Sequence, residues 1–394
     1  MESRGDTTDL QTGVAAGHQP RGWSRTTTRN DLAVVLGVHV AARLVTLVAL
    51  LVAGLLVDRP GLRALERWDA NWYRRIAEHG YGHVHTVPDG RTLADYAFFP
   101  LYPWLEHVVA SVTGLPTMHA GLLASAVCSC VAALGIYTVT AQVASPRAGL
   151  VTAALWSVTP VAVVQSMAYT ESLLTALAAW SFACWLRGRY VAAGLLAVLA
   201  GLTRPFGVAV AIALVAGAVA VLVRDRGAPH RPVGRMVAGA VLAPLGTLAY
   251  LGFVGVREDS ARGYLDVMAA WGNQFDGGAA FATWSVRLLG QNPVGGLLLV
   301  AALGVLVAQV WLLWRDRYPL PLVVFTAVSV LAALVTSSYF GSKPRYLMPV
   351  FTLLIPAAVG LSRWPARRIL VVVCGLGILS ACYGAGWLLG SGPP

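Results

Sequence analysis

The chain has 394 residues, of which 57% are hydrophobic and only 12% are charged. With a mean hydropathy of +0.66, most of its length must lie in lipid, which excludes an ordinary soluble domain. The formal charge of +11 could indicate nucleic-acid binding, but the basic residues are scattered between apolar runs rather than gathered on one face, so we expect no nucleic-acid partner. The five cysteines lie in apolar segments and predict neither a disulfide framework nor a metal site.

The N-terminal segment of the chain is polar. Residues 1–30 lack the apolar core of a cleavable signal, so we expect a disordered cytoplasmic tail. Residues 31–390 then form a single transmembrane domain. The candidate spans are 31–57, 119–143, 147–165, 171–187, 190–203, 205–223, 234–256, 293–314, 319–338, 346–362 and 369–389. The sequence therefore predicts an all-α polytopic membrane protein with about 11 transmembrane helices.

The distribution of arginine predicts the orientation of these spans. Residues 97–114 contain two prolines, Glu106 and His107 in a stretch barely long enough to cross a membrane. If they crossed, every later basic loop would move outside, so the positive-inside rule favours an interfacial segment. With the N-terminus in the cytoplasm, the loops 58–118 and 257–292 and the C-terminus are then extracytoplasmic. Most of the unusual polar sequence falls on that side, and nucleotide sugars and ATP are absent there.

Asp69 is the carboxylate with the most unusual predicted surroundings. If residues 62–76 form one helix in the first outer loop, Asp69 lies in the middle of its apolar face. The residues within roughly 60° of it are Leu62, Leu65, Trp72, Tyr73 and Ile76. Burying an ionised carboxylate without a partner is costly, so Asp69 needs a chemical role or a salt bridge within the loop, for example to Arg204.

Several other polar residues lie at the predicted outer ends of spans. Lys343 and Arg345 flank Pro344, and Arg204 lies at a break between two spans. Cations at this depth can bind a phosphodiester or extend to lipid head groups. Glu171 opens a span, where a carboxylate stabilises a helix N-terminus or binds an acceptor.

Three blocks of the sequence resemble a known family. The runs Arg67-Trp68-Asp69-Ala70-Asn71-Trp72-Tyr73, Ile76-Ala77-Glu78-His79-Gly80-Tyr81 and Phe98-Phe99-Pro100-Leu101-Tyr102-Pro103 are similar to PIG-V-like mannosyltransferases, bacterial relatives of the second mannosyltransferase of GPI-anchor synthesis. Later stretches resemble further landmarks of the family in the same order. These are Tyr169-Thr170-Glu171-Ser172, Leu202-Thr203-Arg204-Pro205 and Pro344-Arg345-Tyr346.

The resemblance implies the GT-C fold, a helical bundle whose first outer loop contains juxtamembrane helices and the catalytic acid. It also implies a polyprenyl-phosphate sugar donor, usually mannose, and a bacterial plasma membrane protein. On this basis Asp69 is the candidate catalytic base, and the donor phosphate is expected at Lys343, Arg345 and Arg204. The candidate substrate-binding residues are Trp68, Trp72, Tyr73, Phe99, Tyr102, Glu171 and Tyr346. Because the leaving phosphate needs cations and no acid, no metal or other cofactor is required.

The acceptor stays open between a glycolipid and another membrane-associated molecule. Two further classes of protein also fit a chain with many spans and buried cations. A lipid-linked sugar transporter or flippase usually has repeated halves, and no convincing repeat occurs in this sequence. A non-catalytic partner of a membrane glycosyltransferase would keep the fold without the activity, and it would tolerate a neutral substitution at Asp69.

Overall fold

The computed structural model describes residues 28–224 and 233–390, which are almost entirely helical. The predicted tail therefore lies outside the described residues up to position 27. The first helices are α1 (Arg29–Leu56), α2 (Asp69–His79), α3 (Leu101–Thr113), α4 (Thr117–Val143), α5 (Pro146–Ser157), α6 (Glu171–Leu186), α7 (Tyr190–Gly201) and α8 (Val208–Arg224). The later ones are α9 (Val233–Leu242), α10 (Leu245–Arg257), α11 (Gly263–Ala270), α12 (Ala279–Gln291), α13 (Pro293–Arg315), α14 (Leu320–Val335), α15 (Lys343–Leu347), α16 (Ile355–Leu361) and α17 (Ala366–Leu389).

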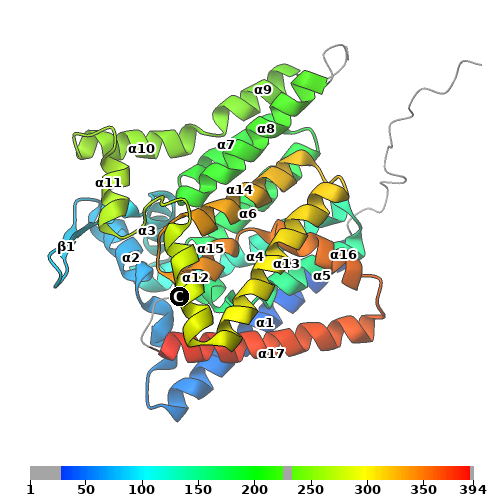
Figure 1. Ribbon diagram of the computed structural model, residues 1–394, viewed down its shortest axis with the longest axis horizontal. Coiled ribbons are helices and arrows are strands. Elements are labelled where there is room, and N and C mark those ends of the chain that lie inside the picture. Colours follow the sequence, from blue (N-terminus) through cyan, green and yellow to red (C-terminus); the bar gives the residue numbers. More distant parts are fainter. Residues whose placement is uncertain (1–27, 225–232, 391–394) are drawn as a thin grey trace, which may run out of the picture.

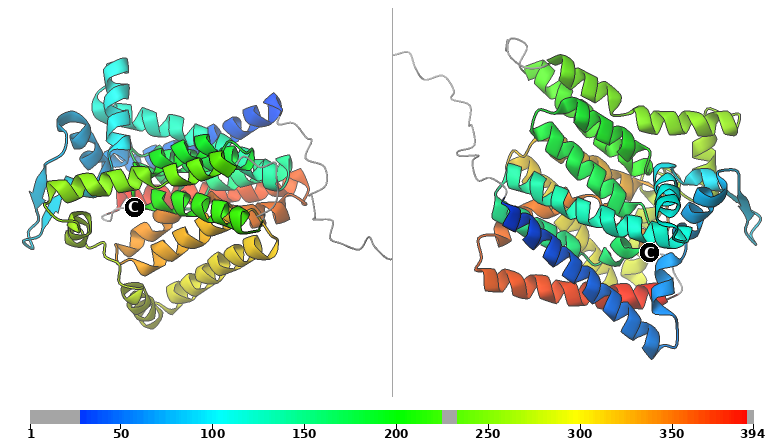
Figure 2. Two further views of the ribbon diagram at one scale, coloured as in Figure 1. Left: turned by 90° about the horizontal axis from the view of Figure 1, so that it is seen from above. Right: turned by 180° about the vertical axis from the view of Figure 1, so that it is seen from behind.

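Short 3-10 turns join many of these helices. They are η1 (Gly61–Glu66), η2 (Asp95–Ala97), η3 (Ala162–Ser166), η4 (Pro205–Gly207), η5 (Phe340–Ser342) and η6 (Phe351–Leu354). The helices α2, α3 and α11 and the hairpin strand β1 (Val84–Thr86) gather at one end of the molecule, and α5 and α16 lie toward the other (Figure 1). Seen from behind, α9 lies at the upper edge of the molecule and α17 toward the lower edge (Figure 2, right).

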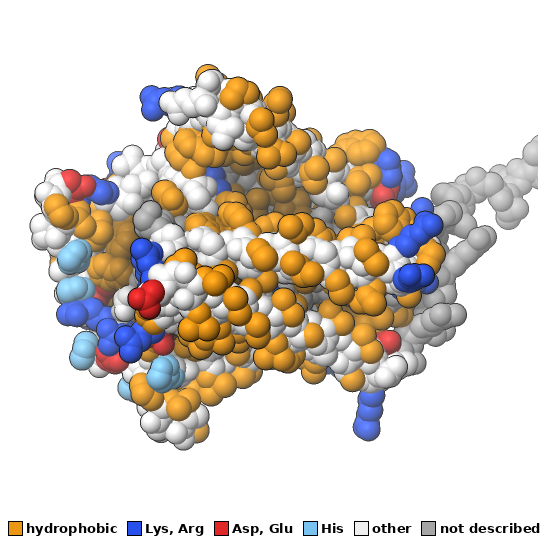
Figure 3. Space-filling model, turned by 90° about the horizontal axis from the view of Figure 1, so that it is seen from below, with side chains coloured by type: hydrophobic (Ala, Val, Ile, Leu, Met, Phe, Trp, Pro, Cys, Tyr) orange, Lys and Arg blue, Asp and Glu red, His pale blue; other side chains and the backbone are white. Residues whose placement is uncertain are grey.

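Within residues 28–224 and 233–390, six helical units are long and apolar enough to cross a membrane, namely α1, α4, α13, α17, the η4–α8 unit and the α9–α10 unit. The bent pair Phe340–Leu347 and Phe351–Leu361, with an angle of 77°, can make a seventh span. Hydrophobic side chains dominate the middle of the face in Figure 3, whereas charged and histidine side chains gather toward the ends. The protein is thus an all-α, multi-pass membrane protein, as the sequence predicts. All the predicted spans contain helical segments, and the count of about 11 crossings stays a prediction.

The first outer loop differs from the single helix predicted over residues 62–76. The chain forms η1, and then Trp68 adopts a φ of 58°, a value that L-amino acids rarely take. This kink ends η1 and starts α2 at Asp69. The prediction that Asp69 lies in the middle of a helical face is therefore wrong, because Asp69 is the first residue of α2. A carboxylate is favourable there, since the helix N-terminus carries partial positive charge.

Hydrogen bonds join the segments 58–118 and 257–292 at one end of the bundle. The hairpin of β1 and β2 (Thr92–Ala94) is held at its base by Asp95, whose carboxylate accepts from the backbone N–H groups of Gly82 and His83. Burial raises the pKa of Asp95, and these two bonds oppose that shift. The Trp271 indole N–H donates to the Ala94 carbonyl at 3.0 Å. Residues 257–292 therefore pack on residues 58–118 and fix the loop that holds Asp69.

Two polar residues inside α1 support a break in the neighbouring helix. The guanidinium of Arg43 donates to the carbonyl groups of Ser157 and Ala162, where α5 gives way to η3. His39 lies 2.8 Å from the Ser157 hydroxyl and stacks on Trp156. Carbonyl groups freed by a broken helix need donors in an apolar surrounding, and these side chains supply them. The break lets the chain after η3 reach the site with Tyr169 and Glu171.

Candidate functional site

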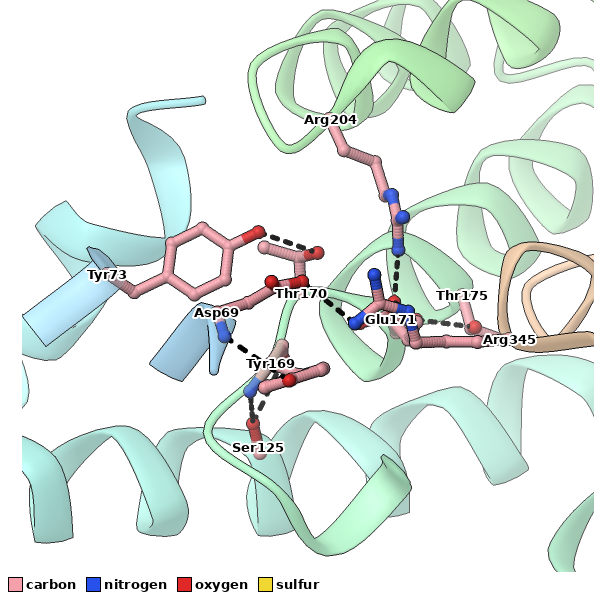
Figure 4. Close-up of polar contacts among 9 residues, drawn as sticks. All are labelled: Asp69, Tyr73, Ser125, Tyr169, Thr170, Glu171, Thr175, Arg204 and Arg345. Carbon is pink, nitrogen blue, oxygen red and sulfur yellow. Dashed lines mark hydrogen bonds and ion pairs between the residues drawn. The ribbon is translucent and has the colours of Figure 1, made fainter. Parts of the chain in front are cut away.

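Four charged side chains from distant parts of the sequence meet at one end of the helical bundle (Figure 4). Asp69 begins α2, Glu171 begins α6, Arg204 precedes η4, and Arg345 lies in the short helix α15. Each residue lies where a helix starts or breaks, so its side chain can turn toward a common centre. We call these four residues the charge cluster.

Arg345 connects the two carboxylates of the charge cluster. Its Nη1 donates to Asp69 Oδ2 at 2.8 Å, and its Nε lies 3.3 Å from Glu171 Oε1. Arg204 pairs with the same oxygen of Glu171. Of the four side chains, only Asp69 is appreciably exposed, at 27%, while Glu171 is 2% exposed. Two carboxylates balance two guanidiniums, which is the condition under which charges can be buried together.

The surroundings of Asp69 leave one of its oxygens available. Oδ2 is held by Arg345, and the Asp69 backbone N–H donates to the Tyr169 hydroxyl at 3.3 Å. Within the described part of the chain, Oδ1 accepts no hydrogen bond. Trp68 provides the kink just before it, and strained backbone of this kind is often found at functional sites. A carboxylate fixed through one oxygen, with the other free and partly exposed, can receive a proton from a bound hydroxyl group.

A layer of hydroxyl and aromatic groups surrounds the charge cluster. The ring of Tyr169 lies 5.0 Å from the Arg345 guanidinium carbon, and its backbone N–H donates to the Ser125 hydroxyl. The hydroxyl groups of Tyr73 and Thr170 are 3.4 Å apart. The sequence analysis did not select Tyr169 or Ser125. Tyr169 stands two residues before Glu171 in a stretch that resembles a family landmark, and that position was the only available signal.

Lys343 is not part of the charge cluster. Its ammonium group donates to the carbonyl groups of Ala333 and Thr336 at 2.7 and 2.8 Å, at the end of α14. It also lies 5.3 Å from the Phe281 ring and 5.6 Å from the Phe340 ring. Two residues apart on α15, Lys343 and Arg345 point in different directions. The structure therefore brings together two of the three cations that we expected at a phosphate.

The predicted aromatic residues divide into two groups. Trp68, Trp72 and Tyr346 are half-buried, and the Tyr346 ring lies 5.4 Å from the guanidinium carbon of Arg204. Phe99 and Tyr102 are 1% and 0% exposed.

These last two side chains pack behind the site. The Phe99 ring contacts the Tyr250 ring, with centroids 4.2 Å apart, and the Tyr102 hydroxyl donates to the Gly121 carbonyl. Both therefore hold α3 in place beside the charge cluster.

Glu106, on α3, is a buried carboxyl outside the charge cluster. Its side chain is fully buried, and neither oxygen has a hydrogen-bond partner among the described residues. Burial, together with the nearby Glu78, raises its pKa to about 9. In the described ranges 28–224 and 233–390, no group of three His, Cys, Asp or Glu side chains is arranged to hold a metal ion.

Known proteins share features with this chain. Residues 97–272 match the family model described as dolichyl-phosphate-mannose-protein mannosyltransferase. The mouse protein GPI alpha-1,6-mannosyltransferase 2 is 31% identical over 156 residues, which cover 37% of this chain and 30% of the mouse protein. The resemblance to PIG-V-like mannosyltransferases is thus confirmed, although the match spans less than a third of that relative.

Solved structures confirm the fold. ArnT from Cupriavidus metallidurans bound to undecaprenyl phosphate is 19% identical with a TM-score of 0.54, over 90% of this chain and 64% of ArnT. The apo state of the same protein is 20% identical with a TM-score of 0.51, over 81% of this chain and 58% of ArnT. The Archaeoglobus fulgidus oligosaccharyltransferase is 14% identical with a TM-score of 0.50, over 91% of this chain and 53% of the oligosaccharyltransferase. The chain has the GT-C fold of these membrane glycosyltransferases and spans less than two thirds of their length.

Proposed function

We propose that this protein is an inverting glycosyltransferase that moves a mannosyl residue from a polyprenyl-phosphate-mannose donor to a glycolipid or another membrane-associated acceptor. The observation that carries the proposal is Asp69 itself, fixed by Arg345 through one oxygen and partly exposed through the other. The matched family model and the mouse relative support the mannosyl group, and undecaprenyl phosphate bound to ArnT supports a polyprenyl-phosphate carrier.

In this reaction Asp69 acts as the general base. The acceptor hydroxyl oxygen attacks the anomeric carbon from the face opposite the phosphate and forms the new glycosidic bond. The bond between that carbon and the phosphate oxygen breaks, and the polyprenyl phosphate leaves with the electron pair. Asp69 Oδ1 takes the proton of the hydroxyl group. One carboxylate is enough, because a phosphate leaves without being protonated when cations stabilise its charge.

The two guanidiniums of the charge cluster bind the donor phosphate. An arginine has five N–H donors, and Arg345 uses only part of them on Asp69 and Glu171. Arg204, next to it, adds a second positive charge. Lys343 is left out of this phosphate site, because its ammonium group is held by the carbonyl groups of Ala333 and Thr336 outside the charge cluster.

The half-buried and hydrogen-bonding residues around the cluster contact the substrates. Trp68, Trp72 and Tyr346 offer aromatic surface to the sugar or the isoprenoid. The ring of Tyr73 is buried, so this residue contributes its hydroxyl group beside Thr170, and Phe99 and Tyr102 pack behind the site. Glu171 positions Arg204 and Arg345 and so acts on the donor phosphate through them. No metal or cofactor is required by this mechanism.

We place the site on the extracytoplasmic face of a bacterial plasma membrane, with the N-terminus in the cytoplasm. The support is the excess of arginine in the loops at the other end of the bundle. Cysteine labelling in intact cells tests this orientation. Position 89, at the tip of the hairpin, should react with a membrane-impermeant reagent, and position 363 should not. Labelling at 363 without labelling at 89 would reverse the orientation.

Replacing the proposed base tests the reaction. Asp69→Asn keeps the size of the side chain, so the protein should fold, insert and bind the donor lipid, but transfer should slow at least about 100-fold. The assay is transfer of labelled mannose from polyprenyl-phosphate mannose to a membrane lipid extract. Asp89→Asn, an exposed carboxylate of the same loop, is the matched control and should retain wild-type activity.

The same assay separates the proposal from its alternatives. Activity with UDP- or GDP-sugars alone would overturn the donor class. Full activity of Asp69→Asn would remove Asp69 from the mechanism and leave Glu171 as the next carboxylate to replace. Wild-type protein that moves labelled lipid across vesicles without transferring sugar would indicate a transporter.

A further inference from the structure

A groove of about 580 Å³ opens at the surface of the bundle between α1, α5 and α17. Its apolar lining includes Val34, Val38, Leu150, Ala154, Leu370 and Val373. Along α17 it extends from Ala366 to Val373, two helical turns or about 10 Å. Val34 and Leu370 are 44% and 62% exposed, and both lie on helices that are long and apolar enough to cross a membrane. The groove therefore faces the hydrocarbon of the membrane, and an acyl chain can lie in it.

Two arginines lie at one end of the groove. Arg147 is the second residue of α5 and Arg367 is the second residue of α17, so both side chains start where their helices begin. Nη2 of Arg147 donates to the Trp364 carbonyl at 2.5 Å, and this bond joins the start of α5 to the chain before α17. Both arginines are exposed, and each guanidinium has five N–H donors. Donors of both side chains are therefore accessible to a ligand.

The protein supplies no anion to this pair of arginines within residues 28–224 and 233–390. Among these residues, no carboxylate lines the groove, and neither arginine forms an ion pair. Asp31, in the first turn of α1, is held instead by the Thr28 backbone N–H and the Tyr137 hydroxyl. Two cations beside one groove repel each other, and an anion between them removes that repulsion and accepts their hydrogen bonds. Charge complementarity therefore favours a negatively charged group at this end of the groove.

The groove is separate from the charge cluster. Helices α1 and α17 begin on the side of the molecule opposite the hairpin of β1 and β2 (Figure 2, right). No residue of the charge cluster lines the groove. Because the donor phosphate has its own guanidiniums in the charge cluster, a different anionic lipid is the better occupant here. A zwitterionic lipid fits less well, since its ammonium group would approach the two arginines.

We propose that this groove binds an anionic phospholipid. One acyl chain lies against the apolar side chains of α1, α5 and α17, and the phosphate oxygens accept hydrogen bonds from the guanidiniums of Arg147 and Arg367. Basic pockets between transmembrane helices bind anionic head groups in the same way. Only five of the 24 residues of α17 are buried, so the lipid also joins this helix to α1 and α5. The lipid is neither donor nor acceptor, and the inference does not depend on the proposed function.

Photocrosslinking with labelled lipids tests the site in the full-length wild-type protein. Phosphatidylglycerol and phosphatidylcholine carry the same diazirine-labelled acyl chain, and each is added at the same small fraction to vesicles of unlabelled phosphatidylcholine. Adducts are located by mass spectrometry at Leu370, which lines the groove, and at Val371, which is 65% exposed on the same helix outside it. We expect the ratio of adducts at Leu370 to adducts at Val371 to be at least about 5-fold higher for phosphatidylglycerol than for phosphatidylcholine.

Two double variants separate the site from the general charge of this end of the protein. Arg147→Gln with Arg367→Gln should lower the phosphatidylglycerol ratio to the phosphatidylcholine value, because no guanidinium remains at the groove. Arg363→Gln with Arg368→Gln removes the same charge from exposed residues that do not line the groove, and this matched control should keep the wild-type ratio.

Three results would overturn the inference. Equal ratios for the two labelled lipids on the wild-type protein would mean ordinary lipid contact. An equal loss in both double variants would mean a general attraction of anionic lipids to these arginines. Stronger displacement of labelled phosphatidylglycerol by unlabelled undecaprenyl phosphate than by an equal amount of unlabelled phosphatidylglycerol would make the groove a polyprenyl-phosphate site. The wild-type comparison needs no variant to fold, and no readout involves sugar transfer.

Discussion

The helices α6 and α13 are similarly apolar in sequence but occupy opposite environments. In α6, 13 of the 16 residues are buried, including Glu171, and the helix packs against α4 and α7. In α13, two of the 23 residues are buried, Gly296 and Leu313. Hydropathy places both helices in the membrane and does not distinguish a protein interior from lipid. The small and polar residues of α6 do distinguish it, because such residues in a span usually face other helices.

The largest difference in stability between the two environments should appear when one ion pair is broken in each. Arg204→Gln leaves Glu171 buried with one cation fewer and should lower the free energy of unfolding by about 3 to 5 kcal/mol. Arg315→Gln removes the ion pair with Asp316 at the end of α13, where both side chains are about half exposed. This substitution should change the free energy of unfolding by less than about 1 kcal/mol. Denaturant midpoints in detergent compare the two variants.

The double variant Glu171→Gln with Arg204→Gln separates charge burial from packing. Removing both charges should recover part of the stability lost in the single variant, since no unpaired carboxylate remains. Equal losses for Arg204→Gln and Arg315→Gln would show that the charge cluster is as solvated as the end of α13.

Glu106 extends the comparison to a buried carboxyl without a cation. Because its pKa in the folded protein is raised to about 9, the folded state keeps a proton that the unfolded chain loses near pH 4.5. This contribution to stability is fully present below pH 4.5 and is lost as the pH rises toward 9, at about 1 kcal/mol per pH unit. Glu106→Gln cannot ionise and should remove this slope, so the variant should be more stable than wild type at pH 8.

Thermal midpoints between pH 5 and 9 measure the slope. The exposed Asp316→Asn is the control and should keep the wild-type pH dependence. A wild-type midpoint that rises with pH over this window would mean that Glu106 is ionised and paired in the folded protein.

The smallest effects should come from adding one methyl group. Gly135 of α4 faces α6, where a new Cβ would lie 2.9 Å from Ala179 Cβ, so Gly135→Ala should destabilise the protein by about 1 to 2 kcal/mol. A Cβ built on Gly304 of α13 would have no other atom within 4 Å. Gly304→Ala should therefore stabilise the protein by about 0.5 to 1 kcal/mol, because alanine has the higher helix propensity. Thermal melts should give opposite signs. Equal shifts would show that the α4–α6 contact can relax.

The candidate site shows where prediction from the sequence succeeds and where it stops. Asp69, Glu171, Arg204 and Arg345 each stand out, because charged residues beside apolar runs need partners. Their pairing was not predictable. The sequence suggests Arg204 as a partner of Asp69, whereas the structure pairs Asp69 with Arg345 and Arg204 with Glu171.

The packing of residues 58–118 could not be predicted from the sequence either. A helical pattern over residues 62–76 is real, but the backbone of Trp68 interrupts it, since η1 packs back against α1 at Leu50 and Gly54. Contacts of this kind involve residues far apart or in separate elements, and periodicity within one segment carries no information about them.

The sequence by itself determined that this is a multi-pass helical protein, because long unbroken apolar runs satisfy their own backbone groups in lipid when they form helices. It also identified charged residues beside apolar runs that need partners. Only the tertiary structure decided which of them meet, that Lys343 points elsewhere, and that Arg43 supports a broken helix. The physical reason is that buried charges and free carbonyl groups are stabilised by particular partners, and those partners are chosen by helix packing.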